Sequence, residues 1–246
     1  MIRFILLVLF LFLFLILTIP ALLVLWILGK SDPARKDRAS KAIVSWGFRS
    51  ITFIAGTKVI VKGREHIPGD SAALFVGNHR SYFDIVLTYT HFPAITGYVA
   101  KKEMLRYPIL KDWMKNIHCL FLDRDNIKEG LKTILKGVDE VKNGISLCIF
   151  PEGTRNREND TFLPFREGSF KIAEKGGVPI VPMVLVNSAD VFEDHLPRIK
   201  KTTVIIEFQD PIYTDQMDRH EKKNLGIQVS NLIKDRYFEL KKEYMG

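Results

Sequence analysis

The sequence is poor in cysteine, with only Cys119 and Cys148 among its 246 residues. Both lie inside apolar runs typical of buried strands, and two such residues supply no disulfide framework. Because a reactive thiol needs a basic and accessible setting, we expect neither to act as a nucleophile. The chain is expected to fold without disulfides, as proteins of a reducing compartment do.

Several functional motifs are also missing. No Gly-x-Ser-x-Gly sequence occurs, which argues against a lipase-like hydrolase. Gly29-Lys30-Ser31 lacks the earlier glycine of a nucleotide-binding loop. Zinc-finger spacing and aromatic ribonucleoprotein motifs are absent too, so we do not expect the net charge of +8 to serve nucleic acid. That charge favours another anionic partner, such as anionic lipid or a phosphorylated metabolite.

Charge is almost absent from the first 29 residues. The run from Ile2 to Gly29 carries Arg3 as its only charge, and it is far longer than the apolar core of a signal peptide. No cleavage-site pattern follows it. We therefore interpret the run as a retained membrane helix, which Pro20 is expected to kink. A membrane span and an insertion in the interface both stay open.

Cations follow this apolar run directly, at Lys30, Arg35, Lys36, Arg38 and Lys41. They indicate a cytoplasmic side if the helix spans and attract anionic headgroups if it lies in the interface. Apolar residues between 43 and 54 predict a second helix, either beside the first, on the membrane surface, or buried in the globular part. Residues 1–60 are thus expected to form a two-helix membrane-associating segment, and residues 61–246 a separate globular domain.

Strand-like and helix-like segments alternate beyond Lys62. Strands are predicted at 72–76, 97–100, 118–122, 145–150, 179–186 and 203–208, and helices at 127–141, 166–175 and 225–240. Such alternation predicts an α/β fold with a mostly parallel or mixed central sheet flanked by helices.

The first of these strands leads into the turn Asn78-His79-Arg80-Ser81-Tyr82-Phe83-Asp84 and then into an expected helix. At such a junction Asp84 can reach one ring nitrogen of His79 and leave the other free as a base. These residues would form the base and orienting half of a catalytic triad. A structural alternative stays open, in which Ser81 caps the helix and Asp84 occupies its third position.

Two further polar loops follow predicted strands, where sites gather in sheets of this kind. Asp123-Arg124-Asp125 follows the strand at 118–122, and Pro151-Glu152-Gly153-Thr154-Arg155 follows the strand at 145–150. The guanidinium groups match phosphate oxygens, and Gly153 and Thr154 add an N–H and a hydroxyl. Asp123 and Asp125 could instead be a metal-binding pair of a glycosyl- or phosphotransferase, although Arg124 between them suits phosphate at least as well.

Four segments together resemble the sequence blocks of the glycerolipid acyltransferases. Residues 78–84 resemble the family's Asn-His-x-Ser-x-x-Asp block, 121–124 its second block, 150–155 its third and 178–182 its fourth, in the family's order. With the apolar N-terminus and the total length, the chain is similar to bacterial 1-acylglycerol-3-phosphate acyltransferases almost end to end.

The resemblance implies a reaction and the residues that perform it. His79, steadied by Asp84, would take the proton from the free hydroxyl of lysophosphatidate, which attacks an acyl thioester to give phosphatidate. The donor would be acyl-carrier protein or coenzyme A carrying the acyl chain, and neither a cofactor nor a metal is expected. Residues expected to hold or shape the phosphate site are Lys101, Arg124, Glu152, Gly153, Thr154 and Arg155.

The expected location follows from the resemblance and from the N-terminal segment. It is the inner membrane of a bacterium, with the α/β acyltransferase domain of residues 61–246 on the cytoplasmic side. Two alternatives stay open. The acceptor could be another glycerolipid, such as glycerol 3-phosphate or another lysolipid, or the chain could be a membrane-binding module without catalysis.

Overall fold

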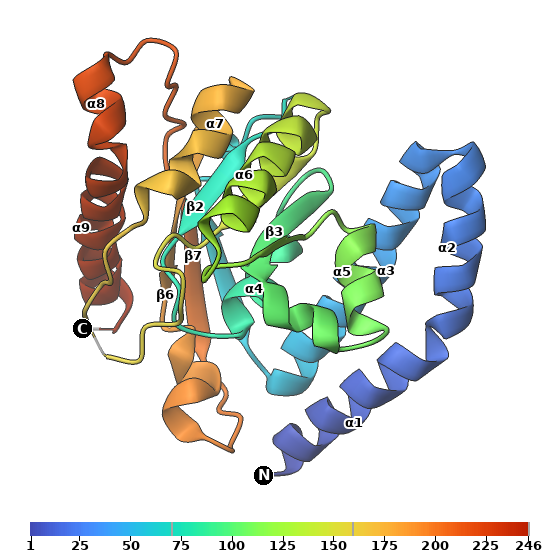
Figure 1. The fold of residues 1–246 in the computed structure, drawn as a ribbon. Coiled ribbons are helices and arrows are strands. Elements are labelled where there is room, and N and C mark those ends of the chain that lie inside the picture. The colour runs from blue at the N-terminus through green and yellow to red at the C-terminus, as the bar shows by residue number, and fades with distance from the viewer. Residues whose placement is uncertain (70, 159, 246) are drawn as a thin grey trace.

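A seven-stranded sheet forms the centre of the computed structural model, which describes residues 1–69, 71–158 and 160–245 (Figure 1). The strands are β1 Lys58–Lys62, β2 Leu74–Gly77, β3 Thr96–Lys101, β4 Leu120–Leu122, β5 Ser146–Ile149, β6 Ile180–Val186 and β7 Thr203–Phe208. Their order in the sheet is β1-β7-β6-β2-β5-β3-β4. β7 runs antiparallel to β6 and parallel to β1, whereas the other neighbours pair in parallel. The α/β fold with a mixed, mostly parallel sheet is therefore confirmed.

Helices cover both faces of the sheet. One face packs on α3 (Pro33–Ala55), α4 (Phe83–Tyr89) and α5 (Leu110–Asn116), and the other on α6 (Ile127–Lys142), α7 (Lys171–Gly176) and α9 (Leu225–Met245) (Figure 1). Successive residues of β2 point to opposite layers, because side chains alternate along a strand. Phe75 belongs to the first core, and Leu74 and Val76 belong to the second. Burial on both faces explains why the central strands read as continuous apolar runs.

The parallel pairing brings the polar loops to one edge. Since β2, β3, β4 and β5 run in the same direction, their carboxyl ends lie together. β2 ends at the turn of residues 78–84, β4 ends before Arg124, and β5 ends before Glu152. The candidate residues thus meet at this edge of the sheet, as expected for such folds.

The N-terminal run forms two helices, α1 (Ile2–Leu17) and α2 (Ile19–Ser31), which are bent by 45° at Thr18. Pro20 lies in the first turn of α2, where its missing N–H breaks no helical hydrogen bond. In the described part of the chain, no single helix has both the length and the apolarity to cross a membrane, while the bent pair meets that criterion jointly. α3 then begins at Pro33, capped by the Asp32 side chain on Arg35 N–H at 2.8 Å.

The structure also contains elements that the pattern did not predict. β1 lies at the edge of the sheet and includes residue 60, where the sequence predicts the boundary between the two parts of the chain. The division into two parts stays a prediction. α5 and the short α8 (Arg219–Lys223) are additional helices. β4 begins at Leu120 and not at His118, because His118 has φ +58°, outside the range of a strand. Its ring lies between Asp37 of α3 and Glu140 of α6, at 3.1 and 2.9 Å.

Candidate active site

The turn after β2 holds His79 and Asp84 in direct contact. His79 Nδ1 donates to Asp84 Oδ2 at 2.7 Å. The carboxylate is fully buried, and the His79 side chain is 15% exposed. An ionised carboxylate only accepts hydrogen bonds, so this contact places the imidazole proton on Nδ1 and leaves the lone pair on Nε2. Nothing in the described residues hydrogen-bonds Nε2.

The expected capping by Ser81 is not found, because α4 begins at Phe83 with Tyr82 as its N-cap and no described side chain caps it, but Asp84 does hold the preceding backbone. The same Oδ2 accepts the backbone N–H groups of Arg80 and Ser81, each at 2.8 Å. In return, the Ser81 hydroxyl accepts the N–H of Phe83 at 2.9 Å. The carboxylate therefore fixes the backbone at the start of α4 and orients the imidazole at the same time.

The imidazole packs face to face on an aromatic ring. The rings of His79 and Phe150 have centroids 4.3 Å apart and an interplanar angle of 11°. Phe150 directly follows β5 and is itself buried. The backbone carbonyl of His79 accepts the Asn156 N–H at 2.8 Å. An imidazole held on one side by a ring and on the other by a carboxylate has little freedom to turn.

Two buried polar side chains hold the first and third blocks in place. Asn78 exchanges two hydrogen bonds, both 2.9 Å, with the backbone of Leu185 in β6. Glu152 accepts the N–H of His79 at 2.8 Å and the N–H of Leu163 at 3.1 Å. Burial raises the pKa of Glu152 despite these two bonds. Each carboxylate oxygen of Glu152 accepts a backbone donor, so the side chain links the loop of His79 to that of Leu163.

Arg124 follows β4 and is a half-buried cation. Its Nε is buried and, among the described residues, has no hydrogen-bond partner. Burial lowers the pKa of this guanidinium, and the nearby Arg166 lowers it further. Two neighbouring guanidinium groups, one with an unused buried donor, form a setting that an anion would stabilise.

Arg155 lies over the first block and is held on two sides. Its guanidinium carbon is 3.6 Å from the centre of the Tyr82 ring, and its Nη1 donates to Glu193 at 3.2 Å. Arg155 is therefore fixed beside the turn that holds His79, with donors still available for a substrate.

The other predicted site residues lie at the same edge with less contact. Lys101 ends β3 and is exposed, opposite Leu122 in the register with β4. Thr154 is exposed, and the Gly153 N–H donates to Phe150 at 3.0 Å within a tight turn. Gly153 has φ +75°, and the Arg166 guanidinium lies over it, so a side chain here would be strained and crowded.

The aspartates of the alternative metal site have other partners, and the two cysteines are buried. Asp123 binds Lys102 at 2.8 Å and accepts the Asp125 N–H at 3.1 Å. The described residues contain no group of three or more His, Cys, Asp or Glu side chains arranged for a metal. Both cysteines are buried thiols, and burial raises the pKa of Cys119 to about 12. Neither thiol is therefore available as a thiolate at neutral pH.

Sequence reasoning missed three residues of this site. Phe150 was identified only as the first residue of the third block, Arg166 only as the start of a helix, and Glu193 not at all. Arg166 carried a weak signal, since it is a cation shortly after the third block. Glu193 lies more than 100 residues from Ser81 and Tyr82, to which it hydrogen-bonds, and no local pattern signals such a contact.

Comparisons with known proteins agree with this geometry. Residues 58–186 match a family model described as Acyltransferase. The chain is 32% identical over 183 residues to the 1-acyl-sn-glycerol-3-phosphate acyltransferase of Borreliella burgdorferi, covering 74% of this chain and 71% of that one. It is 30% identical over 214 residues to the protein of that name from Haemophilus influenzae, covering 85% and 86%. The Saccharomyces cerevisiae protein of the same name is 29% identical, with coverage of 78% and 64%.

The fold has a counterpart among solved structures. The crystal structure of the 1-acyl-sn-glycerophosphate (LPA) acyltransferase PlsC from Thermotoga maritima matches with a TM-score of 0.80, over 98% of this chain and 97% of that one. The two sequences are 24% identical. The match therefore extends the likeness in fold to the N-terminal helices, beyond the range of the family model.

Proposed function

This chain belongs to the 1-acyl-sn-glycerol-3-phosphate acyltransferase family, and we infer that it transfers an acyl group to the sn-2 hydroxyl of 1-acylglycerol 3-phosphate. The product is phosphatidate, a precursor of phospholipids. The observation that supports this reaction best is the contact of 2.7 Å between His79 and Asp84. It leaves Nε2 of a half-buried and oriented imidazole free to accept a proton.

The transfer needs no covalent acyl-enzyme. Nε2 of His79 takes the proton of the acceptor hydroxyl while the hydroxyl oxygen forms a bond to the carbonyl carbon of the thioester. The carbon–sulfur bond then breaks, and the imidazolium returns the proton to the departing thiolate. Asp84 stabilises the imidazolium and holds its orientation. Because a thioester already has a good leaving group, a base with its orienting carboxylate is sufficient.

The acceptor phosphate would be held by cations at the same edge of the sheet. We assign direct contact to Arg124 and Arg155, with exposed Lys101 as a further cation. Guanidinium groups bind phosphate through paired charged hydrogen bonds, and Arg124 has a buried donor without a partner among the described residues. Gly153 and Thr154 would shape the loop beneath the phosphate, and Glu152 would brace it.

The direct test is acyl transfer by the purified protein. Labelled acyl-carrier protein thioester and labelled acyl coenzyme A would each be offered with lysophosphatidate, glycerol 3-phosphate or a lysolipid without a free phosphate. Labelled phosphatidate from lysophosphatidate is the expected product. Transfer to one of the other acceptors alone would contradict the acceptor assignment, and no transfer to any acceptor would contradict the reaction.

The N-terminal helices would hold the enzyme at its lipid substrate. Many large apolar side chains of α1 and α2 are exposed, among them Phe12 at 60%, Leu23 at 60% and Trp26 at 60%. The basic start of α3 follows them. We assign these helices to the cytoplasmic face of a bacterial inner membrane, since apolar side chains insert among lipids and cations attract anionic headgroups.

Flotation with vesicles that contain phosphatidylglycerol tests this assignment. The paired change Phe12→Ser and Leu23→Ser should reduce the bound fraction. Ile127→Ser is the matched control, because Ile127 is 90% exposed but lies on α6. Equal binding by both variants would exclude α1 and α2 as the lipid-binding surface.

A further inference from the structure

A partly buried carboxylate, Asp190, cross-links the segment between β6 and β7. The segment contains two short 3-10 turns, η4 (Ala189–Val191) and η5 (Glu193–His195). Asp190 accepts from His195 Nε2 at 2.7 Å, from Lys200 Nζ at 2.8 Å and from Thr202 Oγ1 at 3.1 Å. Burial alone would raise the pKa of Asp190, but these bonds outweigh it and lower the pKa. The turn that carries Glu193 is therefore anchored from outside the catalytic site.

Glu193 reaches from this segment into the catalytic turn. Its Oε1 accepts the Tyr82 N–H at 2.8 Å, and its Oε2 accepts the Ser81 hydroxyl at 2.5 Å. Oε1 also lies 3.2 Å from Arg155 Nη1. The Glu193 side chain is only 15% exposed. A single carboxylate thus joins the first sequence block to the arginine of the third.

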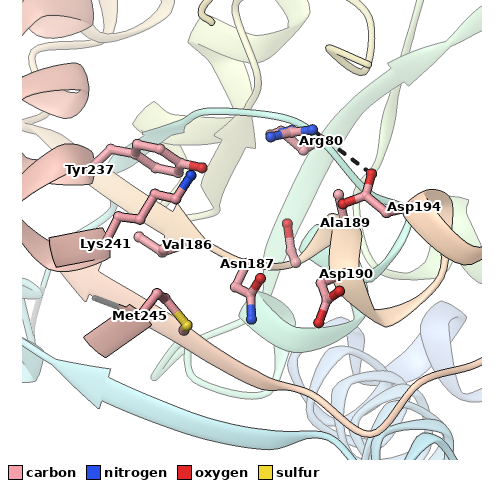
Figure 2. Close-up of a pocket in the computed structure, with 10 residues that line it drawn as sticks. Arg80, Val186, Asn187, Ala189, Asp190, Asp194, Tyr237, Lys241 and Met245 are labelled. Carbon is pink, nitrogen blue, oxygen red and sulfur yellow. Dashed lines mark ion pairs between the residues drawn. The ribbon is translucent and has the colours of Figure 1, made fainter. Parts of the chain in front are cut away.

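The neighbouring residue makes a parallel contact. Asp194 lies 4.0 Å from an Nη of Arg80, and both line a cavity of about 200 Å³ beside Lys241 (Figure 2). Consecutive carboxylates of η5 therefore face consecutive residues of the catalytic turn. The contacts of Glu193 and Asp194 therefore hold η5 against the turn that contains His79.

This arrangement reduces the entropy that Arg155 loses when it binds an anion. A free arginine side chain loses rotamer entropy on being fixed. Arg155 is already fixed between the Tyr82 ring and Glu193. The Tyr82 N–H and the Ser81 hydroxyl hold Glu193 independently of Arg155. The contact of Arg155 with Glu193 uses only Nη1. Further guanidinium donors thus stay available for a substrate.

We propose that Glu193 is a positioning residue for acceptor recognition, which holds Arg155 against Tyr82 and ties it to the turn of His79 and Asp84. The proposal rests on the proposed function, because it needs an acceptor whose phosphate binds Arg155. It predicts that Glu193 changes recognition of the phosphorylated acceptor without contributing to proton transfer. Recognition of the acyl donor should not depend on it.

The test is steady-state kinetics of Glu193→Gln, which keeps the shape and removes the charge. A hydrogen bond between charged groups contributes about 1 kcal/mol more than a neutral one, so the acceptor KM should rise about fivefold. The donor KM and kcat should stay within about twofold of wild type. Preference for lysophosphatidate over 1-acylglycerol, which lacks the phosphate, should fall by the same factor. Glu65→Gln is the control, since Glu65 is 76% exposed on η1 (Arg64–His66).

A double-mutant cycle separates positioning from a general effect on folding. In an Arg155→Ala background, Glu193→Gln should leave the acceptor KM unchanged, because its effect passes through Arg155. An additive rise in that background, an equal rise in the donor KM, or an acceptor KM at or below the wild-type value would each overturn the proposal. A wild-type protein that forms no phosphatidate would instead overturn the proposed function, and the acceptor role with it.

Discussion

His79 Nδ1 lies 2.7 Å from Asp84 Oδ2, and the same oxygen accepts two backbone N–H groups from the intervening turn. One carboxylate oxygen thus holds the backbone of residues 80 and 81 just before α4 and also orients the imidazole. The short His-x4-Asp spacing is what allows the turn to close in this way.

Asp84→Asn should remove most of the activity while the acceptor still binds. The oxygen of the introduced amide can replace Oδ2 and accept the same three N–H groups. Its NH₂ group then takes the place of Oδ1, which has no hydrogen-bond partner among the described residues. The imidazole then loses the charge that stabilises its protonated form, and kcat should fall by about 10³- to 10⁴-fold. Kinetics at saturating acceptor would measure this loss. A folded variant with near-normal kcat would contradict the orienting role.

Arg155→Ala should act mainly on acceptor binding. Loss of a charged contact to phosphate is expected to raise the acceptor KM about tenfold or more, with a smaller effect on kcat. Arg219→Ala offers a matched control, because Arg219 is exposed at the start of α8. If Arg155→Ala and the control had the same acceptor KM, Arg155 would not bind the phosphate.

Glu207→Gln tests a structural contact through its pH dependence. Glu207 of β7 accepts from Arg236 of α9 at 2.7 and 2.9 Å. Burial alone would raise the pKa of Glu207, but these bonds and one from Gln209 outweigh it and lower the pKa below 4.5. A lowered pKa in the folded state stabilises the fold above the unfolded pKa, and this stabilisation is lost as pH falls through the folded value.

Glu207→Gln should therefore lower the free energy of unfolding at pH 7 by about 1–3 kcal/mol. The difference from wild type should shrink as pH falls below about 4.5. Urea unfolding at several pH values would measure it, with Glu239→Gln as the control. Glu239 binds the same Arg236 but is 65% exposed, so its removal should cost little. A difference for Glu207→Gln that does not change with pH would show that the ion pair is not its source.

Local patterns predicted those features that depend on neighbours in the sequence. The α/β alternation, the break near Pro20 and the helix after the turn of residues 78–84 all follow from spacing and turn chemistry within a few residues. The edge that collects Arg124 and Glu152 follows from the parallel direction of the strands. These site assignments stay predictions until variants are measured.

Other features depend on distant parts of the chain, and local patterns did not reveal them. β1 is short and pairs with β7, which is far away in the sequence. His118 has a left-handed backbone conformation, and its ring contacts Asp37 of α3 and Glu140 of α6. In the sequence, nothing distinguishes Glu193 from other acidic loop residues. Its hydrogen bond with Ser81 forms only in the folded chain. In each case the contact that defines the residue is tertiary.

The central claim is that His79 is the base for acyl transfer to lysophosphatidate, and His79→Ala tests it most directly. Phosphatidate formation would be measured for wild type, for this variant, and for His220→Ala, whose imidazole lies on the exposed α8. The account predicts a kcat lowered about 10²- to 10⁴-fold in His79→Ala alone, with the acceptor KM close to wild type. Near-normal turnover by a folded His79→Ala protein would contradict the account.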